Sequence, residues 1–166
     1  PIAKKYSVPI TVFICSGPLK NQGIFWPSYV RKMKDFLPKP YKNDINLLWK
    51  INDKKRAIIV KWLLKNFPRN IKREALSVSD LKEISKLDCI EIGSHTVNHS
   101  ITVNCDTHDL IYEIGQSKKD LENIINKPVR SFSYPNGDYD KRERKFLEKS
   151  GYIFAATTEE RNITTP

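Results

Sequence analysis

The sequence has few of the residues from which disulfide bridges and thiolate metal sites are built. It contains three cysteines, Cys15, Cys89 and Cys105, and no Cys-x-x-Cys spacing. An odd number of cysteines at these spacings indicates neither a disulfide framework nor a thiolate zinc site. One disulfide remains possible, so the cysteines do not decide between a reducing and an oxidising compartment.

Long apolar runs are missing as well. No apolar stretch approaches the roughly 20 residues that a membrane-spanning helix requires, and no signal peptide is visible at the first residues. We therefore expect no transmembrane segment in this chain. The 166 residues suit a single domain, which at this size buries about two-thirds of the surface that its unfolded chain exposes.

Acidic residues are outnumbered by basic ones. The 29 lysines and arginines against 19 aspartates and glutamates give a formal net charge of +10. Such an excess could suit nucleic acid, an anionic glycan or an acidic membrane surface. The basic residues are nevertheless dispersed, mixed with acids and accompanied by few aromatics. We therefore predict a solvated basic surface and no nucleic-acid partner.

Strand and helix patterns alternate along the chain. Short β-branched and aromatic runs predict buried strands at residues 10–14, 90–93, 129–134 and 152–156. Amphipathic spacing and capping residues predict six helices. Three of them are expected to end at Ser7, to begin at Ser77 or Ser79, and to begin at Asp106. The other three are expected to cover residues 28–37, 44–67 and 140–149. This alternation predicts an α/β fold with parallel strands, in one domain over residues 1–166.

Residues from about 20 to 76 interrupt this alternation, and we interpret them as a helical insertion beside the site. The longer helix of this insertion is expected to break near Asn52-Asp53. The apolar side chains that could form its inner face are Trp49, Ile58, Trp62 and Leu63. The tryptophans Trp26, Trp49 and Trp62 could form a platform on which sugars stack, but aromatics at helical spacing more often belong to a core. We therefore predict core packing for them.

The most informative stretch begins at Cys89 and ends at His99. Its first half is a strand pattern that breaks at Gly93. His95 and His99 follow at i and i+4, so one helical turn would place them on the same side, close enough to share a metal ion. A surface turn with two polar residues is the alternative for this spacing. The position at the carboxyl end of a strand favours the metal site, because α/β folds place their sites there.

Two segments carry a resemblance to a known family. Residues 91–99, with the sequence EIGSHTVNH, resemble the second motif of the polysaccharide deacetylases, carbohydrate esterase family 4. Residues 132–139 resemble the third motif of that family in its form F-x-Y-P-x-G. Residues 9–14 and 151–158 are similar to core strands of the same family. The resemblance implies an incomplete, distorted (β/α) barrel of mainly parallel strands.

This resemblance also implies a reaction, the hydrolytic removal of N-acetyl groups from the amino sugars of a polysaccharide or other glycan. His95 and His99 would bind a divalent metal, most often zinc, and Thr96 would lie beside them. The metal would polarise a water molecule and the acetyl carbonyl, and a carboxylate would take the proton.

Other catalytic groups of the family have no counterpart in this sequence. Relatives use two aspartates of a first motif as base and third metal ligand, and a later histidine as acid. This chain has no Asp-Asp pair and no histidine after His108, which itself is predicted to be exposed in a first helical turn. We therefore expect an internal fragment with little activity of its own, from a bacterial enzyme of the cell envelope or a secreted one.

The turn Tyr134-Pro135-Asn136-Gly137 can also be interpreted from its chemistry. Pro135 and Gly137 would fix backbone N–H groups at the carboxyl end of a strand. Such donors stabilise an oxyanion by about 3 kcal/mol each in well-studied enzymes. An ordinary β-turn is the alternative, because this composition is typical of one. The metal motif upstream favours the catalytic interpretation.

Two other classes of function remain open. One is a non-catalytic glycan-binding domain that keeps the deacetylase fold, and the other is a basic interaction module whose two histidines are structural. The residues that precede Pro1 would test the first class, because an Asp-Asp pair there indicates an enzyme. Metal analysis of the full-length protein would test the second, since structural histidines leave it metal-free.

Overall fold

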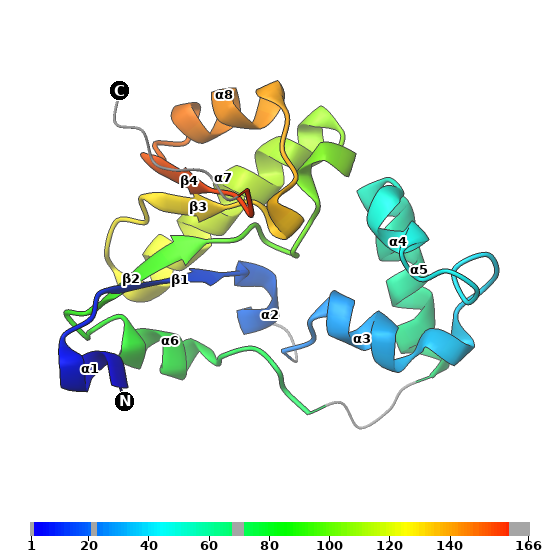
Figure 1. The fold of residues 1–166 in the computed structure, drawn as a ribbon, viewed down its shortest axis with the longest axis horizontal. Helices are drawn as coiled ribbons and strands as arrows, with labels where there is room; N and C mark the ends of the chain where they lie inside the picture. The colour runs from blue at the N-terminus through cyan, green and yellow to red at the C-terminus, as the bar shows by residue number, and fades with distance from the viewer. Residues whose placement is uncertain (1, 21–22, 68–71, 160–166) are drawn as a thin grey trace.

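The computed structural model describes residues 2–20, 23–67 and 72–159. Its centre is a sheet of four strands in the order β1-β2-β3-β4, and every neighbouring pair is parallel (Figure 1). The strands are β1 (Ile10–Ile14), β2 (Ile90–Ser94), β3 (Ser131–Ser133) and β4 (Phe154–Ala156). The predicted α/β class with parallel strands is therefore confirmed. β3 and β4 are shorter than predicted. β3 pairs with β2 only around Phe132, and β4 pairs with β3 only over the residues Phe154–Ala156.

Helices precede and connect the strands, and three of them begin at the predicted capping residues. They are α1 (Ile2–Tyr6), α2 (Ser16–Lys20), α6 (Val78–Ile84), α7 (Thr107–Ile125) and α8 (Lys141–Lys149). Ser77, Asp106 and Asp140 are N-caps whose side chains accept backbone N–H bonds. Asn126 ends α7 in the left-handed conformation. The predicted helix before Ser7 is present as α1, although Pro1 lies outside the described residues.

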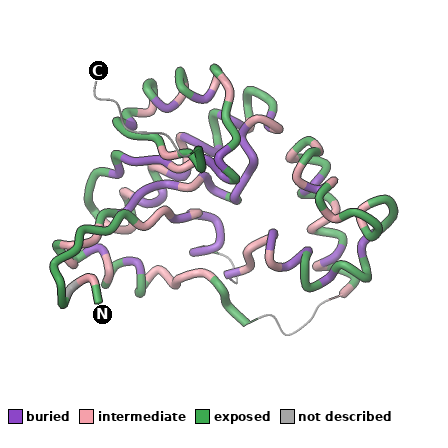
Figure 2. The backbone as a smooth tube through the Cα atoms, viewed as in Figure 1, coloured by how far each residue is buried: buried purple, intermediate pink, exposed green. Residues whose placement is uncertain are grey.

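The main core lies between the sheet and α7, which packs against β2 and contacts α2, α6 and α8. Figure 2 shows buried residues along β2 and β3 and in the segment that follows β2. The prediction of buried strands is wrong for most of β1 and for β4, whose residues are exposed or half-buried apart from Ile14, because these two strands lie at the edges of the sheet. The three cysteines are free thiols. Among the described residues, no helix is both long enough and apolar enough to cross a membrane.

The helices between residues 26 and 66 form a lobe beside the sheet, at the right of Figure 1. It consists of α3 (Trp26–Lys32), the short 3-10 helix η1 (Lys34–Phe36), α4 (Leu47–Lys50) and α5 (Asp53–Asn66). The break between α4 and α5 occurs where we expected it, since the side chain of Asn52 caps α5. The lobe has its own buried cluster, formed by Tyr29, Val30, Met33, Leu37, Leu48 and Leu63.

The predicted inner face of α5 is wrong in part. Leu63 is fully buried, but Ile58 is 67% exposed and Trp62 is 43% exposed. The inward face of the helix instead carries the side chains of Arg56, Ile59, Val60 and Leu63. Ile58 and Trp62 lie on the opposite face, so Trp62 is not a core residue. Trp26 and Trp49 do pack against the cluster of the lobe, which confirms core packing for those two.

Candidate active site

The predicted metal ligands His95 and His99 lie together at the carboxyl end of β2. The strand ends at Ser94, and the loop of residues 95–100 follows it. The two imidazole rings have centroids 4.8 Å apart and planes inclined at 72°. The structure therefore brings this pair together, as their spacing predicts.

The loop between the histidines is not a helical turn, which corrects the interpretation from the sequence. Thr96 and His99 have φ angles of 68° and 56°, a region that residues other than glycine seldom occupy. Thr96 is fully buried, and its Oγ1 accepts a hydrogen bond of 3.0 Å from the backbone N–H of Ser100. The loop is stabilised by hydrogen bonds to neighbouring elements, since it lacks the backbone hydrogen bonds of a helix.

The residues that follow β1 hold the loop from one side. The Cys15 thiol donates to the carbonyl oxygen of His95 at 3.0 Å, and the N–H of Gly17 donates to the carbonyl oxygen of Val97 at 2.8 Å. A Cβ atom at Gly17 would lie 2.8 Å from that same oxygen. Only glycine therefore allows this close approach of the two backbones.

Glu113 of α7 holds the loop from the other side, and the sequence interpretation missed it. Its carboxylate accepts hydrogen bonds from the backbone N–H of Val97 at 2.8 Å and of Asn98 at 2.9 Å, and from the Asn98 side chain at 2.8 Å. Glu113 is buried. A usable signal was present, because Glu113 lies three residues after Leu110 and therefore falls on the buried stripe of the helix.

The two imidazoles are held differently. The Nδ1 atom of His95 lies 2.7 Å from the carbonyl oxygen of Ser133 at the end of β3. When Nδ1–H donates to this carbonyl, Nε2 is left with its lone pair for a metal, an arrangement typical of metal-binding histidines. The Nδ1 atom of His99 is buried and has no hydrogen-bond partner among the described residues.

Burial also sets the charge of both rings. Burial lowers the pKa of His95. Burial, together with the neighbouring His95, lowers the pKa of His99 to about 3. Both rings are therefore neutral near pH 7, and neutral imidazole is the form that binds a metal ion.

The predicted turn after β3 begins beside His95, since Tyr134 follows the carbonyl that His95 contacts. Pro135 has no N–H, and the N–H of Gly137 donates to the carbonyl oxygen of Tyr134 at 2.9 Å. The N–H of Asn136 is therefore the donor that the turn could offer to a substrate. Tyr134 is buried and stacks on Tyr139 with ring centroids 5.1 Å apart. Its burial raises the pKa of Tyr134 to about 12, which suits packing better than proton transfer.

A cavity of about 480 Å³ opens beside His95. Its walls include Phe13, Cys15 and Phe25, together with the carboxylate residue Glu74. Glu74 forms an ion pair with Lys32, and the hydrogen bond from Lys32 lowers the pKa of Glu74. The volume lies in the range of sites for small ligands, about 300–1,000 Å³.

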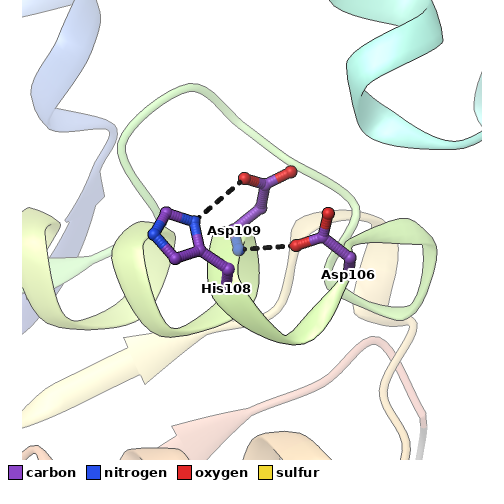
Figure 3. Close-up of side chains that lie close together, drawn as sticks. All are labelled: Asp106, His108 and Asp109. Atoms are coloured by element: carbon purple, nitrogen blue, oxygen red, sulfur yellow. Dashed lines mark hydrogen bonds and ion pairs between the residues drawn. The ribbon is translucent and has the colours of Figure 1, made fainter.

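A third metal ligand does not join the two histidines in the described part of the chain. There, the only group of three ligating side chains is Asp106, His108 and Asp109 (Figure 3). Asp106 is occupied as the N-cap of α7, accepting from the N–H of Asp109 at 2.9 Å, and Lys54 forms ion pairs with both aspartates. The His108 side chain is 91% exposed, as predicted, so we assign this group to the helix terminus.

Comparisons with known sequences find one family. The sequence profile described as "Polysaccharide deacetylase" matches residues 49–155, more than half of the chain. The protein named "Putative polysaccharide deacetylase YxkH" from Bacillus subtilis (strain 168) is 32% identical over 84 residues, which are 51% of this chain and 30% of YxkH.

Comparisons with solved structures find the same fold. The Streptococcus pyogenes deacetylase PplD in complex with acetate has a TM-score of 0.61 at 18% identity, covering 96% of this chain and 49% of PplD. IcaB from Ammonifex degensii has a TM-score of 0.57 at 14% identity, covering 95% of this chain and 52% of IcaB. The predicted incomplete (β/α) barrel is thereby confirmed, and the chain spans about half the length of these solved relatives. Because the family profile covers most of its length, this chain belongs to the polysaccharide deacetylase family.

Proposed function

We propose that this chain forms part of a metal-dependent enzyme that removes N-acetyl groups from the amino sugars of a glycan. The observation that carries the proposal is the pairing of His95 and His99 at the carboxyl end of β2, with ring centroids 4.8 Å apart. Catalytic metal sites in hydrolases use such imidazole ligands. The acetate bound to the related PplD fits this reaction, because acetate is the acid released when an N-acetyl group is hydrolysed.

The donor set at the site fits a divalent ion. Both rings are neutral near pH 7, and a buried nitrogen of His99 has no partner among the described residues. Imidazole ligands suit zinc among the available divalent metals. When bound, such an ion would polarise the water and the acetyl carbonyl.

The protein groups would perform three tasks in this reaction. His95 and His99 would hold the ion, while Thr96 and Glu113 keep the loop between them in shape. The N–H of Asn136 would donate to the oxyanion that develops from the acetyl carbonyl.

A second candidate follows from the same site. Since no third ligating side chain joins His95 and His99 among the described residues, a glycan-binding domain that keeps the fold without catalysis is the alternative. The two candidates differ in whether acetate is released.

The test uses the full-length protein and an N-acetylated glucosamine oligomer. We expect zinc in the purified protein and release of acetate from the oligomer. Replacing His95 and His99 together by Ala should abolish both, while His108→Ala, at an exposed position, should retain both. Zinc retention by the double variant would refute the ligand assignment. Zinc-bound protein that binds the oligomer without releasing acetate would favour the glycan-binding domain.

A further inference from the structure

The helical lobe contacts the backbone of His99 directly. The indole Nε1–H of Trp26, at the start of α3, donates to the carbonyl oxygen of His99 at 3.1 Å. His99 is one of the residues with a positive φ angle, 56°. The hydrogen bond is made in this conformation and helps to stabilise it, which matters because residues other than glycine seldom adopt a positive φ.

The same lobe surrounds the imidazole of His99. Phe25 contacts the ring edge-on with centroids 4.7 Å apart, and the Trp26 ring lies 6.2 Å away. His95 has a carbonyl partner that fixes its ring, whereas Nδ1 of His99 has none among the described residues. The orientation of His99 therefore depends on its own backbone and on these aromatic neighbours.

Trp26 is itself held in place by buried groups. The guanidinium of Arg56 lies 4.4 Å from the centroid of the Trp26 ring. The Arg56 side chain is 2% exposed. Arg56 forms an ion pair with Asp53, whose Oδ2 accepts a hydrogen bond of 3.0 Å from the hydroxyl of Ser100. Ser100 follows His99 in the chain. These contacts therefore connect Trp26, through Arg56 and Asp53, back to the residue next to His99.

We propose that Trp26 is a positioning residue for His99, and that the helical lobe thereby sets the metal affinity of the site. The inference rests on the proposed metal-dependent function. Outer residues that orient a ligating histidine typically contribute tenfold to hundredfold in metal affinity. Trp26 contributes through the orientation of the His99 backbone and does not touch the metal.

The test compares two Trp→Phe variants of the full-length protein. Trp26→Phe keeps an aromatic ring under Arg56 and removes the N–H donor. Trp62→Phe is the matched control, because Trp62 is 43% exposed on the outer face of α5. The measurement is the zinc dissociation constant, obtained by competition with a chromophoric chelator, on protein whose circular dichroism matches that of the wild type.

We expect the zinc dissociation constant to rise about tenfold in Trp26→Phe and to change less than about twofold in Trp62→Phe. An unchanged constant in Trp26→Phe, or an equal rise in both variants, would overturn the positioning role. Absence of zinc binding in the wild type would overturn the proposed function itself. Should Trp26→Phe not fold, 3-benzothienylalanine at position 26 keeps the ring shape without the N–H, and the same outcomes apply.

Discussion

Glu113 shows how much a single side chain does for the loop that carries the histidines. Its carboxylate accepts three hydrogen bonds from Val97 and Asn98. Two of the donors are backbone N–H groups that no helix or strand partner satisfies. A buried carboxylate with three donors is a strong acceptor, so it fixes the loop at the point midway between His95 and His99.

Removing this carboxylate should destabilise the protein. Glu113→Ala removes the acceptor of the backbone N–H groups of Val97 and Asn98. Asn98 is exposed and can bond to water, whereas Val97 is buried, and one unsatisfied buried donor costs about 1–3 kcal/mol. We expect the free energy of unfolding to fall by about that amount in urea denaturation. Glu83→Ala, on the exposed surface of α6, is the control and should change it by less than about 0.5 kcal/mol. Equal stability of Glu113→Ala and the wild type would show that the loop does not depend on this contact.

At the scale of elements, the turn after β3 depends on the conformation of its backbone. Asn136 has a φ angle of 62° and Gly137 a φ angle of 82°. A Cβ atom at Gly137 would overlap the side chain and backbone of Thr158. Asn is one of the few residues other than glycine that tolerates the left-handed region. Asn136→Gly therefore removes the side chain with less strain than Asn136→Ala.

This geometry allows a test of the turn as an oxyanion donor. We expect Asn136→Gly to leave kcat within a few-fold of the wild type, because only its N–H is needed. Gly137→Val should lower kcat on the order of a hundredfold with little change in KM, since the contact forms only in the transition state.

Steady-state kinetics on the full-length enzyme measure both variants, after circular dichroism and zinc analysis show them folded and loaded. A folded, zinc-loaded Gly137→Val variant with normal kcat would reduce the turn to a structural role. A hundredfold loss in Asn136→Gly would instead assign the function to the side chain.

Elements with local signals were predictable, and those that depend on distant contacts were not. Helix starts at Ser77, Asp106 and Asp140 follow from side chains that cap their own helices. The exposed position of Trp62 was not predictable, because the inward face of α5 is decided by a buried Arg56 that pairs with Asp53.

The candidate site likewise has features that the sequence predicts and features that it does not. The meeting of His95 and His99 after a strand was predicted, although the helical turn on which that prediction relied is absent. The left-handed conformation of Thr96 and His99 was not, because it results from hydrogen bonds to α2, α7 and the lobe. Those partners are distant from the loop in sequence, as the separation of 73 positions from Trp26 to His99 illustrates.

At the scale of the whole molecule, the site lies where three parts of the fold meet. The sheet supplies both histidines through the carboxyl end of β2 and the Ser133 carbonyl through β3. α7 supplies Glu113, and the helical lobe supplies Trp26 (Figure 1). Parallel strands bring their carboxyl ends to one edge of the sheet. The fold therefore gathers at one edge groups that are distant in the sequence.

X-ray absorption at the zinc edge, on the full-length protein, tests the central claim most directly. We predict zinc with at least two imidazole nitrogens at about 2.0–2.1 Å, the usual Zn–N distance. The double replacement of His95 and His99 by Ala should remove the imidazole contribution, and His108→Ala should leave the spectrum unchanged. A protein without zinc, or a spectrum that survives the double replacement, would contradict the assignment of this pair as the metal site.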